Sequence, residues 1–300
     1  MRWNDMRESS NVEDRENSSA GGGGGGFGGG GFGGGGLRLG IGGIVAVVVV
    51  GMLFGKSPIE MLGLISQLSG GGAPQVQQQT PARPVNPNDP GKVFVARVLG
   101  DTEDTWGRIF KASGRTYRPP RLVLFRGAVD SGCGYTTSAV GPFYCPTDSK
   151  LYLDRNFFDE LNTRFGAPGQ FAESYVIAHE VGHHVQNLLG ISAKVHERQT
   201  SVGKAAANAL SVRLELQADC FAGVWGHDAQ QRQLVNGQDM EQALVAANAI
   251  GDDTLQRNAG RSVAPDSFTH GSSEQRQRWF RKGFETGSVD ECNTFTARQL

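Results

Sequence analysis

The chain has 300 residues, and its 29 lysines and arginines against 30 aspartates and glutamates give a formal net charge of −1 at pH 7. This near-neutral balance gives no indication of a nucleic-acid partner or an acidic substrate. The length allows about two domains of roughly 150 residues. The first ninety residues hold a glycine tract, an apolar run and a Gln/Pro-rich stretch, so about 210 residues remain for one core of ordinary size.

Residues 1–36 are predicted to form a disordered, glycine-rich tail. Residues 1–20 are polar and charged with few apolar groups, and residues 21–36 are glycine apart from Phe27 and Phe32. A segment with so little apolar surface to bury stays disordered. Glycine also loses the most backbone entropy on ordering, so its tract is expected to act as a flexible tether.

Residues 37–55 are predicted to form a single transmembrane helix. They contain the uncharged run LGIGGIVAVVVVGMLFG between Arg38 and Lys56, at the short end of the length range for a bilayer crossing. A buried strand does not fit between a glycine tract and a polar stretch. A cleaved signal sequence would have too long a charged leader. Residues 56–91 follow as a flexible linker rich in Gln and Pro.

The cysteines bear on which side of the membrane the domain lies. Their even count is compatible with two disulfides in an oxidising compartment, although four reduced, buried thiols are the alternative. Cys133 and Cys145 bracket a turn-rich loop that a disulfide would close. Basic residues flanking the apolar run give only a faint signal. The cysteines therefore favour an N-terminus inside and a domain outside.

Helical and strand patterns alternate along residues 92–300. Apolar residues recur at helical spacing from residue 92 to residue 113, and short β-rich runs predict two strands. Three further helices are expected downstream, the first of them ended by a glycine. The strands lie at 121–125 and 150–154, and the helices at 171–190, 208–231 and 239–253. The pattern predicts one α+β domain that is mainly helical with a small β-sheet.

The motif AHEVGHH places His179 and His183 four positions apart, with Glu180 between them. Positions i and i+4 lie on one helix face about one turn apart, so both imidazoles can reach one ion. Glu180 lies at the rim of that face. HExxH on a helix predicts two zinc ligands and a carboxylate that takes a proton from a water molecule. Two helix-face histidines without a metal are the alternative.

A catalytic zinc needs a third protein ligand and one open position. Glu215 and Asp219, in LELQADCFAG, are again four apart on a predicted helix with apolar neighbours. We expect Glu215 to bind the zinc and Asp219 to accept the N–H of a ligating histidine. Spacing alone does not rank two carboxylates on one face, so the reverse assignment stays open.

The other histidines have different expected roles. His184 is turned about 100° around the helix from His183 and should miss the metal. His196 and His227 stand in polar contexts and are expected at the surface. His270 follows the helices in a loop, where it is a candidate donor to the oxyanion formed at a scissile carbonyl.

These residues resemble the bacterial neutral zinc metallopeptidases of the YpfJ type. The resemblance runs over nearly the whole chain, in MRW…RESSNVEDR, the glycine tract, TEDTWG, GCG…GPFYCP, AHEVGHHVQ, LELQADCFAGVWGH, IGDD and DSFTHGSSEQR. It implies a zinc peptidase that acts on peptide or protein substrates with one zinc ion. It does not identify a substrate.

The motifs are also similar to those of the integral-membrane CAAX prenyl proteases and their HtpX-type relatives, which pair HExxH with ExxxD and a later histidine. This similarity implies that Glu215 is the third zinc ligand, that Asp219 supports the site, and that His270 and Arg276 match the later His and Arg. Those enzymes have several membrane spans, whereas this sequence predicts one. A prenylated substrate is therefore not implied.

The sequence thus predicts a zincin-like metallopeptidase domain over 92–300 after one transmembrane helix. The expected location is the inner (cytoplasmic) membrane, with the domain on the periplasmic side. Strand 150–154 is expected to pair with an extended peptide substrate. The rival interpretations are a non-catalytic, membrane-anchored zinc-binding scaffold and a zinc amidase acting on a non-peptide amide.

Overall fold

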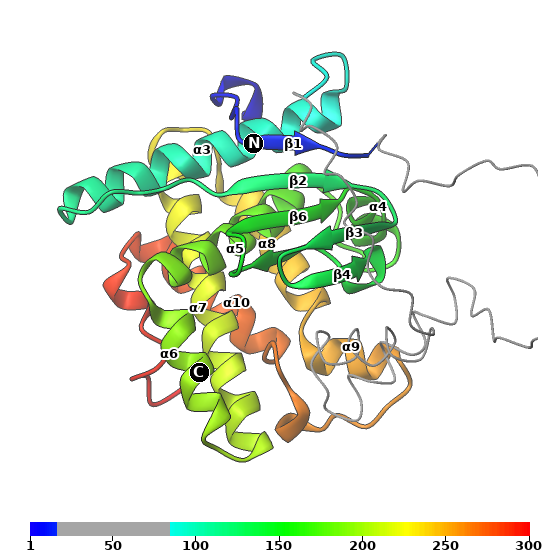
Figure 1. Ribbon diagram of the computed structural model, residues 1–300, viewed down its shortest axis with the longest axis vertical. Helices are drawn as coiled ribbons and strands as arrows, with labels where there is room; N and C mark the ends of the chain where they lie inside the picture. Colours follow the sequence, from blue (N-terminus) through cyan, green and yellow to red (C-terminus); the bar gives the residue numbers. More distant parts are fainter. Residues whose placement is uncertain (17–84) are drawn as a thin grey trace, which may run out of the picture.

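The computed structural model describes residues 1–16 and 85–300. The predicted transmembrane helix at 37–55 lies outside this range, as does most of the predicted linker at 56–91. Within the described residues, no helix combines the length and apolar character that a bilayer crossing requires. The α+β prediction is confirmed, because several helices pack against a small β-sheet (Figure 1).

Four short strands form the main sheet in the order β1-β2-β6-β5. Strands β1 and β6 run parallel to β2, and β5 runs antiparallel to β6. Strands β2 and β6 lie at the predicted positions. Two more strands, β3 and β4, form an antiparallel hairpin. The bounds are β1 (Val12–Asp14), β2 (Arg121–Phe125), β3 (Ala128–Ser131), β4 (Gly134–Thr137), β5 (Phe143–Cys145) and β6 (Lys150–Asp154).

The sheet buries both faces, because successive side chains of a strand point to opposite sides. Leu122, Leu124 and Leu151 belong to the main core shared with the helices. Val123 and Tyr152 belong to a smaller apolar cluster on the opposite face. The central strands are therefore continuous apolar runs, as is usual for strands covered on both sides.

The helices are α3 (Pro90–Ala112), α4 (Asn156–Thr163), α5 (Gln170–Leu188), α6 (Ile191–Thr200), α7 (Lys204–Gln231), α8 (Gly237–Ala249), α9 (Asp252–Asn258) and α10 (Ser273–Thr286). Helices α3, α5 and α7 match predicted helices closely. The helix predicted over 239–253 is divided at Gly251, because that residue packs directly against Ser273 with no room for a side chain. A second helix, α9, begins after this contact.

Small residues let three helices approach one another closely. A Cβ added at Gly182 of α5 would lie 2.9 Å from the backbone oxygen of Ala218 in α7. A Cβ added at Gly283 of α10 would overlap the backbone oxygen of Cys220, also in α7. Helix α7 is therefore packed at near-backbone distance between α5 and α10, and these are the helices that carry HExxH and Arg276.

The prediction of a disordered tail is wrong for residues 1–16. This segment contains a 3₁₀ turn, η1 (Trp3–Asp5), and strand β1, which extends the sheet along β2 (Figure 1). Its few apolar residues are used for packing, since Met6 and Val12 are buried in the main core. Low average hydrophobicity concealed an edge strand that is ordered by the rest of the domain.

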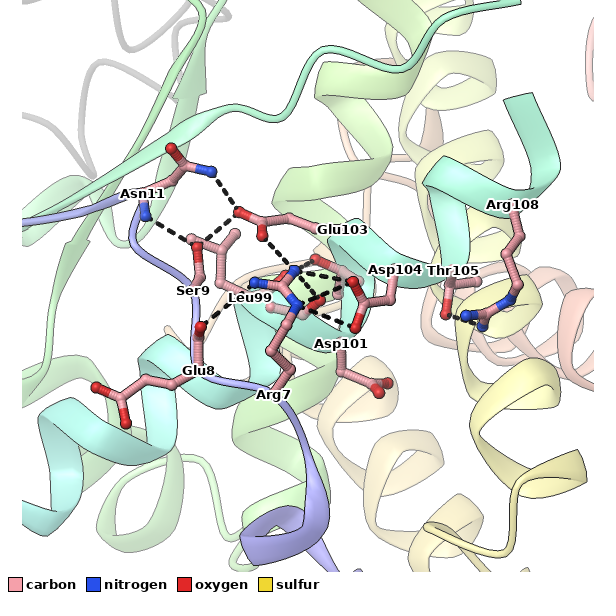
Figure 2. Close-up of polar contacts among 12 residues, drawn as sticks. Arg7, Glu8, Ser9, Asn11, Leu99, Asp101, Glu103, Asp104, Thr105 and Arg108 are labelled. Atoms are coloured by element: carbon pink, nitrogen blue, oxygen red, sulfur yellow. Dashed lines mark hydrogen bonds and ion pairs between the residues drawn. The ribbon is translucent and has the colours of Figure 1, made fainter. Parts of the chain in front are cut away.

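The charges of this segment are paired with α3. The Arg7 guanidinium donates to Glu103 at 2.7 Å and to Asp104 at 2.9 Å, as Figure 2 shows. Glu103 also accepts hydrogen bonds from the Ser9 hydroxyl at 2.6 Å and the Asn11 amide at 2.8 Å. These groups belong to a segment that was predicted to be disordered, but they bind a carboxylate that is itself buried.

One arginine forms ion pairs with residues on both sides of the undescribed segment 17–84. Arg155 donates two hydrogen bonds of 2.7 Å to Glu16 and two of 3.0 and 3.1 Å to Asp89. The Lys92 ammonium adds contacts to Asp14 at 2.5 Å and to Glu16 at 3.0 Å. We call these five residues the N-terminal clamp. Residues 1–16 and 85–300 thus form one folded body.

Two disulfides close the domain. The expected Cys133–Cys145 bond is present, and it ties the β3–β4 hairpin to β5. A second bond joins Cys220 of α7 to Cys292 in the 3₁₀ turn η4 (Asp290–Cys292). All four cysteines are therefore paired, as their even number allowed. The other short turns are η2 (Ser138–Val140) and η3 (Pro265–Ser267).

Candidate metal centre

Three side chains from two helices converge at the crossing of α5 and α7. His179 and His183 project from one face of α5, and Glu215 reaches them from α7. The two Nε2 atoms lie 3.2 Å apart, and the nearest carboxylate oxygens lie 3.2 Å from His179 and 3.4 Å from His183. A tetrahedral zinc with bonds of about 2.0–2.2 Å places its ligands about 3.3–3.6 Å apart. The donor set therefore fits one zinc ion.

Asp219 lies on the other side of the His179 ring and is fully buried. It accepts a hydrogen bond of 2.8 Å from Nδ1 of His179, which leaves Nε2 of that ring free for the metal. Arg276 donates two hydrogen bonds of 2.8 and 2.9 Å to the same carboxylate. This geometry favours Glu215 as the third zinc ligand. Asp219 instead supports the ligand His179, as carboxylates typically do for metal-bound histidines.

The charge state of Asp219 follows from its partners. Burial alone would raise the pKa of this carboxyl, but Arg276 and His179 lower it to about 2. Tyr175, one turn before His179, also donates its hydroxyl to Asp219 at 2.5 Å. Asp219 is therefore an ionised acceptor that holds His179 in one tautomer. Sequence reasoning missed Tyr175, although its i−4 position relative to His179 was a usable signal.

His183 has its own support in Gln186. Its Nδ1 donates to the Gln186 side-chain oxygen at 2.9 Å, so its Nε2 also remains free. The amide of Gln186 in turn donates to the backbone oxygen of Leu214 at 2.6 Å. The contact links α5 to α7 one residue before Glu215. Gln186 was not predicted, and only its i+3 spacing from His183 pointed to it.

Glu180 is buried beside the two histidines, with 9 % of its surface exposed. Burial raises the pKa of this carboxyl, while the neighbouring imidazoles of His179 and His183 act in the opposite direction. Among the described residues, no group donates a hydrogen bond to it. A partly desolvated carboxylate without a donor is well suited to accept a proton.

His270 lies in the loop between α9 and α10 and pairs with Asp252 at the start of α9. Its Nδ1 lies 3.1 Å from an Asp252 oxygen, and its side chain is 38 % exposed. Gly271, the next residue, packs against Leu216 and Val212 of α7, so the loop of His270 lies beside the helix that carries Glu215. Asp252 was not recognised in the sequence, because no helical spacing links it to the zinc motif.

The remaining histidines mostly follow expectation. His184 is buried away from the metal ligands, where it contacts the Tyr144 hydroxyl at 3.1 Å and the Arg118 backbone oxygen at 2.7 Å. His196 is exposed, as expected. The surface prediction for His227 is wrong in part, since this side chain is half-buried and donates to the backbone oxygen of Phe284 at 2.8 Å.

The expected role of strand 150–154 is wrong. This strand, β6, is hydrogen-bonded to β2 on one side and to β5 on the other, so it has no edge for a substrate. The main sheet has two edge strands, β1 and β5. Tyr144 of β5 accepts a hydrogen bond of 2.9 Å from Asn187 at the end of α5, so β5 is attached to the helix that carries HExxH.

Comparison with known proteins agrees with this geometry. The family model described as "Putative neutral zinc metallopeptidase" matches residues 1–295. The Escherichia coli (strain K12) protein YpfJ is 50 % identical over 296 residues, which is 98 % of this chain and 99 % of that protein. The Mycobacterium tuberculosis (strain ATCC 25618 / H37Rv) protein Rv2575 is 41 % identical over 223 residues, 71 % of this chain and 74 % of that protein.

No solved structure matches the chain. The family and the His/His/Glu donor set together identify zinc as the cofactor, which confirms the sequence prediction. The match reaches both the N-terminal strand and the C-terminal helix, so it covers every element that builds the metal centre. The chain belongs to the neutral zinc metallopeptidase family.

Proposed function

We propose that this protein hydrolyses peptide bonds in peptide or protein substrates, with zinc held by His179, His183 and Glu215 and with Glu180 as general base. The observation that carries the proposal is the convergence of two imidazoles and one carboxylate at tetrahedral spacing beside a buried carboxylate without a donor. A catalytic zinc site keeps three protein ligands and one open position, which this donor set matches.

Each residue of the site has a separate role in the proposed hydrolysis. Zinc held by His179, His183 and Glu215 would polarise a carbonyl and would lower the pKa of a water molecule to roughly 7. Glu180 takes the proton of the attacking water and later returns it to the leaving amine. Asp219 and Gln186 keep the two imidazoles in the tautomers that present Nε2. His270 donates a hydrogen bond to the oxygen that gains negative charge.

An extended substrate has one suitable place to pair with the sheet. Of the two edges of the main sheet, the β1 edge lies at the N-terminal strand, whereas β5 is attached to α5 through Tyr144. We therefore assign strand addition to β5 in place of β6. A substrate in this position would run along the helix that carries Glu180.

Two other functions share some of these observations. A scaffold with structural zinc would usually have four protein ligands, and the described residues offer three at this site. A zinc amidase acting on a non-peptide amide would use the same residues, so only a substrate separates it from a peptidase. Attachment to the inner membrane through residues 37–55 remains part of the proposal, supported by their apolar sequence.

The test compares the full-length protein with its Glu180→Gln variant for zinc content and for cleavage of unfolded proteins. We expect one zinc per chain in both and turnover only in the former, because the substitution removes the base and spares the ligands. Glu173→Gln is the matched control, since Glu173 lies in the first turn of the same helix. Two zinc-loaded, inactive proteins would refute the peptidase, and cleavage of non-peptide amides alone would favour the amidase.

A further inference from the structure

We propose that Asp252 is a positioning residue, which holds the His270 imidazole by its Nδ1 so that Nε2 is the ring nitrogen left to donate at the metal centre. The inference rests on the proposed function, because it assigns the group that supports the candidate oxyanion donor. It also joins two motifs, IGDD and FTHGSS, that the zinc ligands leave unexplained.

Asp252 binds the loop as well as the imidazole. One of its oxygens accepts three backbone N–H groups in succession, from Thr269 at 2.7 Å, His270 at 2.7 Å and Gly271 at 3.1 Å. The other oxygen faces Nδ1 of His270 at 3.1 Å. The Asp252 N–H donates back to the Gly271 oxygen at 2.9 Å. One carboxylate thus contacts both the backbone and the ring of His270, and the Thr269 hydroxyl lies 3.1 Å from the same Nδ1.

The next residue anchors the same loop without touching His270. Asp253 accepts hydrogen bonds from the backbone N–H of Ser273 at 2.7 Å and from its hydroxyl at 2.8 Å. Ser273 is the first residue of α10, the helix that carries Arg276. The loop is therefore fastened to the frame of the metal centre at two adjacent carboxylates, of which only Asp252 contacts the imidazole.

Packing places this loop beside the third zinc ligand. A Cβ added at Gly271 would lie 3.2 Å from Leu216 and 3.3 Å from Val212, which flank Glu215 on α7. Gly271 has a φ of 93°, a conformation in which glycine is favoured. The chain turns there against α7, directly after His270, so His270 stands in the loop that packs beside the helix segment carrying Glu215.

The charges around His270 favour its protonated form. Partial burial lowers the pKa of His270, but the hydrogen bond and charge of Asp252, together with the charge of Glu215, raise it to about 9 against the opposing effect of Arg276. A protonated imidazole donates through Nε2 and carries a positive charge, so it can stabilise an oxyanion. Loss of one such donor costs roughly 100-fold to 1000-fold in kcat.

The experiment compares Asp252→Asn with Asp253→Asn in the full-length protein. An asparagine at 252 keeps an oxygen for the three backbone N–H groups but removes the charge facing His270. The first readout is the pKa of His270, followed by NMR with labelled histidine and assigned with His270→Gln. The second is the pH dependence of kcat/KM on denatured casein as the probe substrate.

We expect Asp252→Asn to lower the pKa of His270 by at least one unit, to move the alkaline limb of the profile to lower pH, and to reduce kcat at least tenfold. Asp253→Asn should leave the pKa and the limb unchanged. Equal behaviour of the two variants would overturn the inference. A wild-type protein that binds zinc and cleaves nothing would instead refute the proposed function, while the NMR result would still test the pair.

Discussion

At Asp219, hydrogen bonds from three side chains meet on one buried carboxylate. Arg276 supplies the positive charge there, and His179 and Tyr175 each add a hydrogen-bond donor. An ionised group in such a position is stable only while its partners remain. The tautomer of a zinc ligand therefore depends on an arginine from another helix, α10.

Replacing Arg276 with methionine should destabilise the fold and weaken the metal centre together. Asp219 would remain buried beside His179 with its strongest partner removed, and breaking a buried ion pair in this way costs roughly 3–5 kcal/mol. Urea unfolding with and without zinc measures the effect. Tyr175→Phe is the matched control, because loss of one neutral hydrogen bond costs only about 1 kcal/mol. Equal losses in the two variants would contradict the assigned role of Arg276.

The residues of the centre that could be predicted are those linked by helical spacing. His179 and His183 are four positions apart, and so are Glu215 and Asp219. A helix brings residues at this spacing to one face, whatever the rest of the fold does. Asp252 had no such link, since it reaches His270 across 18 positions through a loop. Its role depends on tertiary packing, which periodicity does not report.

At the scale of elements, the site depends on how closely α5 approaches α7. Gly182 lies between His179 and His183 on the side of α5 that faces Ala218. Gly182→Ala should force the helices apart, because the new methyl group meets backbone that has no rotamer to change. We expect a loss of roughly 1–3 kcal/mol in the free energy of unfolding, from overpacking. Zinc affinity, measured by competition with a chelator, should fall with it.

The matched control for this substitution is Gly107→Ala in α3. A Cβ at Gly107 meets nothing within 4 Å, so alanine should stabilise that helix by about 0.5–1 kcal/mol. Zinc affinity should be unchanged. A Gly182→Ala variant with normal zinc affinity would show that the distance between α5 and α7 does not control the centre.

Strand β1 is an element that the sequence did not predict. Helices α5 and α7 have long periodic patterns, but β1 has three residues, two of them acidic. Its order comes from β2 and from cations supplied by residues far along the chain, such as Lys150 at 3.1 Å from Glu13. Average composition therefore predicted disorder for a segment that other elements hold in place.

The docking of β1 should depend on pH with a defined sign. Burial would raise the pKa of Glu13 and Glu16, but their partners, which include Arg15 for Glu13 and Arg155 for Glu16, lower both pKa values below normal. A lowered pKa in the folded state gives stability that is present at neutral pH and is lost as the pH falls below the ordinary glutamate value. Hydrogen exchange should show β1 losing protection on acidification before α7 does. Simultaneous loss in both elements would contradict this order.

At the scale of the whole molecule, the N-terminal clamp constrains the membrane topology. Glu16 and Asp89 share the Arg155 guanidinium, and β1 is a strand of the same sheet as β2. Strands of one sheet lie in one compartment. One crossing by residues 37–55, with the N-terminus inside and the domain outside, would place β1 and β2 on opposite sides of the membrane, so we predict a different path for the chain. We expect residues 1–16 and 85–300 to lie on the same side of any membrane, and the two disulfides favour an oxidising compartment for both.

Single added cysteines test this topology in the full-length chain. Ser10 and Glu197 are both exposed, and the four native cysteines are paired, so Ser10→Cys and Glu197→Cys each provide one reactive thiol. A membrane-impermeant maleimide applied to cells with a permeable outer envelope should label both variants to the same extent before detergent is added. Labelling of Glu197→Cys alone would support a single crossing by residues 37–55. It would also contradict the pairing of β1 with β2. The variant Arg155→Met serves as the structural control: it should loosen residues 1–16, seen as faster proteolysis there, without changing the side on which either thiol reacts.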